Sequence, residues 1–302
     1  MKPGRRFKFV LEAAGLYLAV GIVRLLSPEA ASNLGGFLGR LIGPRLGITR
    51  RARRNLRLAF PEKSTAEIEA IVRGMWDNLG RVAAEYPHLG AITAATSDRV
   101  ELAGVDAVRA VRDGGKAGIL ASAHLANWEI MPVVAAQNGV DMTVVVREPN
   151  NPYVRDLIDR LRGVAGGWRT AKGSGGARQA MEVLRGGGVL GVLFDQKMNA
   201  GLSIPFFGVA ARTAAAPARL ALRFRCPLVP VRIERTGPAR FRVFAHPPLV
   251  LPEGGDREAA TIQIMVELNS ILEGWIRARP EQWLWLHRRW PESAHREPDE
   301  VA

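Results

Sequence analysis

The sequence has very few residues that bind metals or form covalent cross-links. Its 302 residues include a single cysteine, Cys226, which excludes an internal disulfide and any metal site built from thiolates. None of the five histidines has a partner four residues away, so the helical zinc motif is missing as well. We therefore expect no metal ion and no other cofactor.

Acidic side chains are scarce at the start of the chain. The first 60 residues hold twelve lysines and arginines but only two acids, Glu12 and Glu29. The formal net charge of the whole chain is +13, so most of the excess positive charge lies in its first fifth. Such a field attracts polyanions, which include nucleic acid, anionic phospholipid and phosphorylated glycolipid. Composition alone does not choose among these three.

The chain also lacks an uninterrupted apolar run of clear membrane-spanning length. Residues 9–26 form the longest apolar stretch, but they contain Glu12 and Arg24 and fall short of the roughly 20 residues that a spanning helix needs. A cleaved signal peptide is one interpretation, with residues 2–8 as its basic start. No small-residue cleavage site follows the apolar core directly, so we favour a retained segment.

A second apolar stretch, residues 34–48, is interrupted by glycines and by Pro44, and the basic run 50–57 follows it. Apolar residues interleaved with arginines are typical of a segment that lies on an anionic membrane surface. We therefore predict that residues 1–60 form an N-terminal membrane-anchoring helical region. Insertion at the interface is favoured slightly over a full span, and the sequence leaves both open.

A different pattern begins at residue 61. Ser64 and Glu67 have the spacing of a capping box, and apolar residues then recur at helical period as far as residue 86. We predict an α/β domain over residues 61–290 and a loose tail over 291–302. The polar residues of this first helix are expected to face solvent: Arg73, Asn78, Arg81 and Glu85.

Strands and helices are expected to alternate through the rest of the domain. Strands are predicted at 100–102, 118–123, 142–146, 189–194, 228–234 and 241–244, with a possible hairpin around 236–238. Helices are predicted at 104–113, 127–138, 152–163, 176–185, 215–224 and 257–278. This alternation indicates an α/β fold with a mostly parallel central sheet and helices on both faces.

Several polar residues directly follow predicted strands. His124 follows the strand 118–123, Arg147 follows 142–146, and Asp195 and Gln196 follow 189–194. In an open α/β sheet, binding sites form at the carboxyl ends of the strands. We therefore expect these side chains to meet.

His124 is followed five residues later by Glu129, at the expected start of a helix. A carboxylate that holds an imidazole fixes its tautomer and stabilises the imidazolium, which is what a general base requires. The alternative is a buried histidine and a glutamate that only favours the helix macrodipole. A later histidine, His287, lies in a basic and aromatic run and is interpreted as structural packing.

Five blocks of sequence resemble one family in the same order. They are HLANWE (124–129), VVVREPNNPYV (144–154), GVLFDQKMNAGLSIPFFGVAART (191–213), CPLVPVRIER (226–235) and PEQWLWLHRRW (280–290). Together they resemble the lipid A biosynthesis acyltransferases. These are the late lauroyl and myristoyl transferases of the His-x4-Asp/Glu glycerolipid acyltransferase superfamily.

The resemblance implies a glycerolipid acyltransferase-like fold, with His124 and Glu129 as the catalytic pair. It implies that a fatty acyl chain moves from an acyl carrier protein, or alternatively from acyl-CoA, to a hydroxyl of an anionic glycolipid, a lipid A precursor. The substrate-binding residues expected from it and from the strand ends are Arg147, Asn150, Asp195, Gln196 and Lys197. The expected location is the cytoplasmic face of a bacterial inner membrane, without a nucleic-acid partner.

Two alternatives remain open. The enzyme could acylate another glycolipid or a lysophospholipid, such as a phosphatidylinositol mannoside, with the same pair of residues. A protein of a different class, a non-catalytic basic protein that binds membranes or nucleic acid, would have no use for His124 and Glu129 together.

Overall fold

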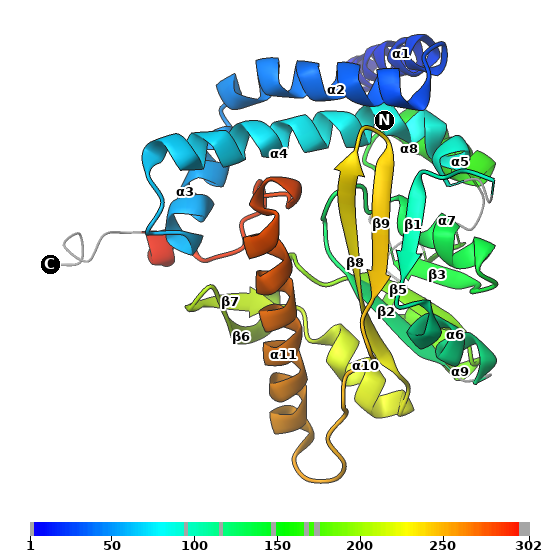
Figure 1. Ribbon diagram of the computed structural model, residues 1–302, viewed down its shortest axis with the longest axis vertical. Helices are drawn as coiled ribbons and strands as arrows, with labels where there is room; N and C mark the ends of the chain where they lie inside the picture. The colour runs from blue at the N-terminus through cyan, green and yellow to red at the C-terminus, as the bar shows by residue number, and fades with distance from the viewer. Residues whose placement is uncertain are drawn as a thin grey trace, which may run out of the picture.

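A central sheet covered by helices forms the body of the protein in the computed structural model (Figure 1). The structure describes residues 3–93, 96–114, 117–145, 149–165, 169–171 and 176–295. The sheet has seven strands in the order β1-β9-β8-β2-β5-β3-β4. Five of its six strand pairings are parallel, and β8 with β9 is the antiparallel one. The prediction of a mostly parallel sheet is confirmed.

The strands of this sheet are β1 (Val100–Ala103), β2 (Gly118–Ser122), β3 (Met142–Val145), β4 (Arg169–Ala171), β5 (Val189–Leu193), β8 (Leu228–Gly237) and β9 (Arg240–Ala245). The helices are α1 (Pro3–Arg24), α2 (Pro28–Ile42), α3 (Thr49–Ala59), α4 (Thr65–Glu85), α5 (Leu89–Ile92), α6 (Val105–Asp113), α7 (Ile130–Gln137), α8 (Pro152–Ala165), α9 (Gly176–Arg185), α10 (Ala216–Phe224) and α11 (Arg257–Ala278). Both the hairpin around residues 236–238 and the capping box of Ser64 and Glu67 are present.

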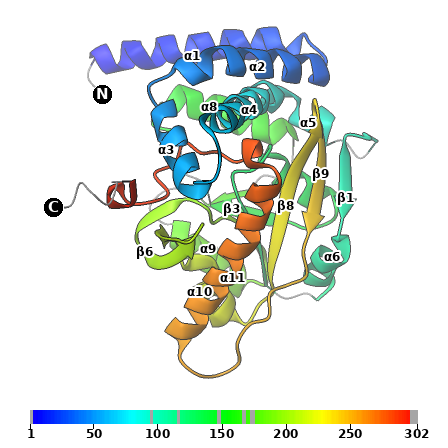
Figure 2. The same ribbon diagram turned by 60° about the vertical axis from the view of Figure 1, so that its left-hand side comes forward.

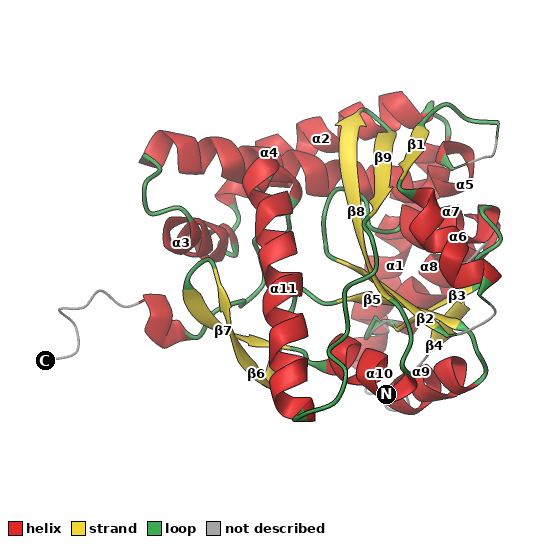
Figure 3. Ribbon diagram, turned by 60° about the horizontal axis from the view of Figure 1, so that its bottom comes forward, coloured by secondary structure: helices red, strands yellow, loops and turns green. Residues whose placement is uncertain are grey.

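Helices cover both faces of the sheet because successive side chains of a strand point in opposite directions (Figure 3). Along β2, Ile119 and Ala121 pack into one cluster with α9, α10 and α11. Leu120, between them, packs into a second cluster with α6 and α7. Every residue of β2 is buried, as expected for a strand in the middle of a two-faced sheet.

A small second sheet was not predicted from the sequence. Strands β6 (Lys197–Phe206) and β7 (Val209–Thr213) form an antiparallel hairpin. Its turn residues, Phe207 and Gly208, both have positive φ, at 52° and 73°. Two such residues suit the tight turns of hairpins, but asparagine or aspartate usually occupies the first position. Phenylalanine there gives no sequence signal, and the ring packs between Phe60, Trp285 and Trp290 instead.

The glycines of the second apolar stretch have two roles. Helix α2 runs through Gly35, Gly36 and Gly39 and packs closely on α4. A Cβ on Gly35 would lie 2.3 Å from the carbonyl oxygen of Gly80, and one on Gly39 would lie 2.0 Å from that of Trp76, so these glycines allow two helix backbones to approach. The expected interruption occurs at Gly43 and Pro44, where α2 ends and a short 3-10 helix follows.

Helices α1 and α2 lie along the same end of the molecule, beside α4 (Figures 1 and 2). Many of their apolar side chains face outward, including Phe7 and Leu18, which are 68% and 67% exposed, and Leu25 in the turn between them is 87% exposed. Among the described helices, none combines the length and the apolar character needed to cross a membrane.

Candidate active site

The register of the sheet brings His124 and Asp195 together. Strands β2 and β5 are parallel neighbours, and Ser122 pairs with Leu193. His124 and Asp195 each lie two residues beyond this pair, so both leave the carboxyl edge of the sheet at the same level. This edge is where an open α/β sheet forms its sites.

Asp195 binds the imidazole directly. Its Oδ1 lies 2.8 Å from Nδ1 of His124, and its Oδ2 accepts the backbone N–H of His124 at 3.0 Å. Nε1 of Trp283 also donates to Oδ2, at 2.8 Å. With Nδ1 protonated and donating to the carboxylate, Nε2 of His124 carries the lone pair, which is the form that a general base needs.

The Asp195 side chain is completely buried. Burial by itself would raise the pKa of its carboxyl group, because it disfavours the charged form. Attraction to His124, hydrogen bonds from the side chain and backbone of that histidine, and attraction to His287 outweigh burial, and the pKa of Asp195 lies well below its ordinary value. The carboxylate is therefore ionised in the folded protein at neutral pH.

The amide of Gln196 faces the free nitrogen of the His124 ring, and two aromatic rings lie beside it. Nε2 of Gln196 lies 3.1 Å from Nε2 of His124 and 3.5 Å from Nε2 of His287. The rings of His287 and Trp128 each lie 5.0 Å from the His124 ring, edge to face. A substrate hydroxyl that approached Nε2 of His124 would take the place of the Gln196 amide.

The structure corrects the expected partner of His124. Glu129 is 5% exposed, but its carboxylate binds Tyr86 and Arg162: the Tyr86 hydroxyl donates to Oε2 at 2.7 Å, and Arg162 donates to both oxygens at 3.1 and 3.2 Å. No contact within the described residues joins this carboxylate to His124. The reason is local geometry, because α7 begins at Ile130 and leaves Glu129 in the turn before it.

That turn is held by its own side chain and by a distant segment. Ala126 has a positive φ of 48°, and Oδ1 of Asn127 accepts the backbone N–H of Glu129. The backbone of Ala126 donates to Gln282, and Leu284 donates back to the carbonyl of His124. The backbone of the turn thus pairs with residues 282–284. These hydrogen bonds prevent α7 from extending back toward His124.

A buried polar network supports the turn from behind. Arg235 on β8 and Glu85 on α4 form an ion pair through both carboxylate oxygens, and Asn127 donates to the same carboxylate at 2.9 Å. Asn78 and Gln282 complete the network through hydrogen bonds to Arg235. The expectation that Asn78 and Glu85 face solvent is wrong, since both are buried. The apolar residues of α4 recur at helical period whether its polar residues face solvent or a buried network. Periodicity therefore could not show that Asn78 and Glu85 are buried.

His287 was missed as a member of the site. Burial lowers its pKa to about 4; attraction to Asp195 opposes this, while the charges of His124, Arg289 and Arg51 add to it. The ring is therefore neutral at pH 7. Its only sequence signal was its place in the block 280–290, because the residues that surround it come from elsewhere in the chain.

The other predicted site residues do not join this cluster. Asn150 and Lys197 are exposed, and no contact of the described residues connects either one to His124. Arg147 lies outside the described residues. Of the predicted substrate-binding set, the structure therefore brings Asp195 and Gln196 to His124.

The described residues that could hold a metal ion are His124, Asp195 and His287, whose ligand atoms lie within 4.8 Å of one another. The missing four-residue histidine spacing was thus a weak argument, because the fold assembles ligands from separate segments. The carboxylate here already accepts three hydrogen bonds, one of them from Nδ1 of His124.

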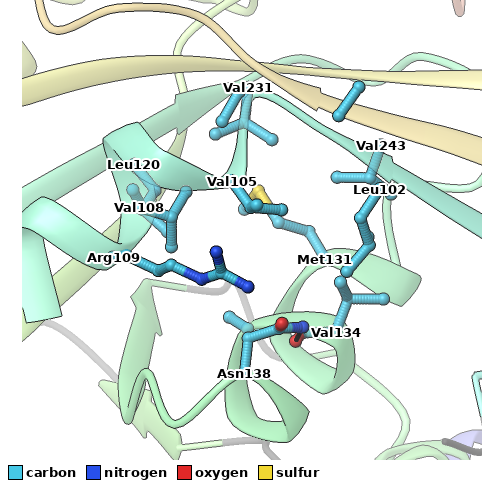
Figure 4. A pocket seen from close by; sticks show the side chains of 13 residues that line it. Leu102, Val105, Val108, Arg109, Leu120, Met131, Val134, Asn138, Val231 and Val243 are labelled. Carbon is cyan, nitrogen blue, oxygen red and sulfur yellow. Dashed lines mark hydrogen bonds between the residues drawn. The ribbon is translucent and has the colours of Figure 1, made fainter.

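A separate apolar cavity lies between α6, α7 and the sheet (Figure 4). It has a volume of about 40 Å³, and Leu120, Met131 and Val134 are among the side chains that line it. Arg109 and Asn138 contribute the polar groups on its wall. None of these residues contacts His124, so this cavity is distinct from the site.

An imidazole fixed by a buried carboxylate at the carboxyl edge of a parallel sheet is the arrangement of an enzyme that takes a proton from its substrate. The model of one family, the bacterial lipid A biosynthesis acyltransferases, matches residues 7–292. The chain belongs to this family, and it is an acyltransferase. The resemblance found in the five sequence blocks is confirmed.

Curated relatives agree with this assignment. The chain is 28% identical over 278 residues to the lipid A biosynthesis myristoyltransferase of Escherichia coli, which covers 89% of this chain and 83% of the relative. The lipid A biosynthesis acyltransferase 1 of Shigella flexneri matches with the same identity and coverage. The phosphatidylinositol mannoside acyltransferase of Mycolicibacterium smegmatis is 24% identical over 217 residues, 70% of each chain.

Proposed function

We propose that this acyltransferase moves a fatty acyl chain from an acyl-carrier-protein thioester to a hydroxyl group of a lipid A precursor. Two of its relatives carry lipid A biosynthesis in their names, which favours this acceptor. The observation that carries the chemistry is the 2.8 Å contact between Nδ1 of His124 and Asp195, because it leaves Nε2 free to accept a proton.

In the proposed reaction, Nε2 of His124 takes the proton of the acceptor hydroxyl as its oxygen attacks the thioester carbonyl. Asp195 stabilises the imidazolium that forms. The tetrahedral intermediate then expels the carrier thiolate, which receives the proton from His124, and the products are an ester and a free thiol. A thioester is already activated, so the enzyme supplies a positioned base and proximity.

We also propose that the N-terminal helices bind a membrane surface. The outward-facing apolar side chains of α1 and α2 support this, as do the arginines in the segment that follows. Each basic residue near an anionic surface contributes about 1 kcal/mol, and buried apolar area adds about 25 cal/mol per Å². The location that we propose is the cytoplasmic face of a bacterial inner membrane, where a carrier-bound thioester and a membrane glycolipid can meet.

An acyl-transfer assay with purified protein tests the proposed reaction. Acyl carrier protein loaded with a fatty acid should acylate a lipid A precursor, and mass spectrometry should detect one added acyl chain. Acyl-CoA replaces the carrier in a parallel assay. Transfer to a phosphatidylinositol mannoside but not to the lipid A precursor would favour the second acceptor, which the mycobacterial relative supports.

The membrane proposal has its own test. High salt should release only part of the protein from anionic vesicles, whereas detergent should release all of it. Complete release by salt would show that the apolar surface of α1 and α2 does not enter the bilayer.

A further inference from the structure

A cleft lined by arginines lies between the start of α3 and the end of the described chain. Arg50, Arg51 and Arg54 line it from α3, and Arg288 lines it from the segment after the last long helix. Its volume is about 230 Å³. In two views the C-terminal helix η5 (Glu292–His295) lies against α3, so the two walls of the cleft are far apart in sequence but adjacent in space (Figures 1 and 2).

Most of the positive charge in this cleft is not neutralised. Arg54 pairs with Glu292 at 2.8 Å, and both side chains are exposed. Arg50, Arg51 and Arg288 have no carboxylate within ion-pair distance in the described part of the chain. Three like charges facing one cleft repel each other, and a bound anion would relieve that repulsion.

The helix itself disfavours this arrangement. Arg50 and Arg51 lie in the first turn of α3, and no acidic residue does. The amino end of a helix has a partial positive charge, so acids are favoured there and arginines are not. The same partial charge would add to the attraction for an anion placed in the cleft.

Asn55 joins the two walls of the cleft. It is 1% exposed, and its Nδ2 donates to the backbone carbonyls of Trp285 and His287, both at 2.8 Å. These two hydrogen bonds hold the segment that carries Arg288 against α3 and so fix the spacing of the arginines.

His287 connects the cleft to the active site. Its carbonyl accepts the hydrogen bond from Asn55, and its ring lies 5.0 Å from the ring of His124. A single residue therefore contacts both the wall of the cleft and the catalytic base, which places the cleft beside the active site.

We propose that the cleft binds a phosphate monoester of the acceptor lipid while an acceptor hydroxyl reaches His124. This inference rests on the proposed function, because it assigns a group of the proposed acceptor to a site. The planar forks of the arginines match phosphate oxygens, which only accept hydrogen bonds. A doubly charged monoester suits three unpaired arginines better than a singly charged diester does.

Direct binding provides the first test. Glucosamine 1-phosphate, inorganic phosphate and unphosphorylated glucosamine are titrated calorimetrically into the full chain in detergent at fixed low salt. The double variant Arg50→Gln/Arg288→Gln should weaken binding of glucosamine 1-phosphate at least about tenfold. Both residues are exposed, so the variant should fold, and its melting temperature checks this.

Arg57→Gln/Arg45→Gln is the matched control. It also removes two positive charges from exposed positions, on α3 and just before it, but neither Arg57 nor Arg45 lines the cleft. Its affinity for glucosamine 1-phosphate should stay within twofold of the unmodified chain. An equal loss in the control, or no measurable binding of either phosphate compound by the unmodified chain, would overturn the proposal.

Kinetics provide the second test. In the double variant, KM for a phosphorylated acceptor should rise at least about tenfold while kcat is retained, and a dephosphorylated acceptor should show no change. A rise in KM for the acyl carrier instead would assign the cleft to the donor and refute the inference. If no acyl transfer occurs at all, the proposed function fails and the titrations alone decide the cleft.

Discussion

Two carboxylates lie on either side of the HLANWE turn, and they have different partners. Asp195 is fully buried and receives its hydrogen bonds from His124 and Trp283. Glu129 is nearly as buried, but it binds a guanidinium and a phenol, from Arg162 and Tyr86. Glu129, five residues from His124, thus connects α8 and the end of α4 to the turn. Asp195, 71 residues away in sequence, is the carboxylate that binds the imidazole. Proximity in sequence does not decide which acid serves a base.

The loss of His124 should have the largest effect on activity. His124→Ala removes the group that accepts the proton, and acyl transfer should fall by about 10² to 10⁴-fold. Folding and vesicle binding should be retained, and a circular dichroism melt with a flotation assay checks both. Activity within a few-fold of the unmodified protein would show that His124 is not the base. The question of whether Asp195 or Glu129 supports it would then no longer arise.

The variant Asp195→Asn tests directly whether Asp195, and not Glu129, is the partner of His124. The amide keeps the shape but not the charge that stabilises the imidazolium, and it can hold the wrong tautomer of His124. We expect kcat to fall by about 10² to 10³-fold with little change in KM. Steady-state kinetics on both variants, Asp195→Asn and Glu129→Gln, give the decisive ranking. A smaller loss for Asp195→Asn would restore Glu129 as the partner of the base.

Glu129→Gln should act mainly on stability. Arg162 is largely buried, and removing the charge of one partner of a buried pair costs up to about 3 kcal/mol of unfolding free energy. Activity should fall by no more than roughly tenfold, since the His124 contacts remain intact. Urea denaturation measures the first effect and initial rates measure the second. An undiminished unfolding free energy would contradict a supporting role for this carboxylate.

The smallest effect concerns pH. The pKa of His287 is about 4 in the folded protein, below its ordinary value of 6.5, because burial disfavours its charged form. Between these two values the unfolded chain binds a proton that the folded chain does not. Unfolding free energy should therefore fall as pH decreases from about 6.5 to 4. The lowered pKa of Asp195 acts only at lower pH, where its carboxylate becomes protonated and its contribution is lost.

His287→Asn should flatten this pH dependence. Thermal melts of both proteins at several pH values between 4 and 7 would show it. Parallel curves would mean that burial does not hold His287 neutral in the folded protein.

Much of the catalytic sheet edge could be predicted. A strand ending before His124 and another ending before Asp195 are visible as short apolar runs, and the rule that sites lie at carboxyl ends places both residues at one edge. The β6–β7 hairpin and the burial of Glu85 could not be predicted. Phe207 adopts positive φ only because aromatic packing holds it, and Glu85 is buried only because Arg235 meets it from β8.

The sequence by itself determined the alternation of strands and helices, the five motif blocks and the excess of arginine near the amino end, because these depend on local periodicity and residue type. The tertiary structure decided which carboxylate holds His124, since strand register brings Asp195 level with it while the turn directs Glu129 elsewhere. It also decided that His287 belongs to the site and that arginines from α3 and residue 288 share one cleft. Those relations depend on contacts between distant segments, which no local pattern encodes.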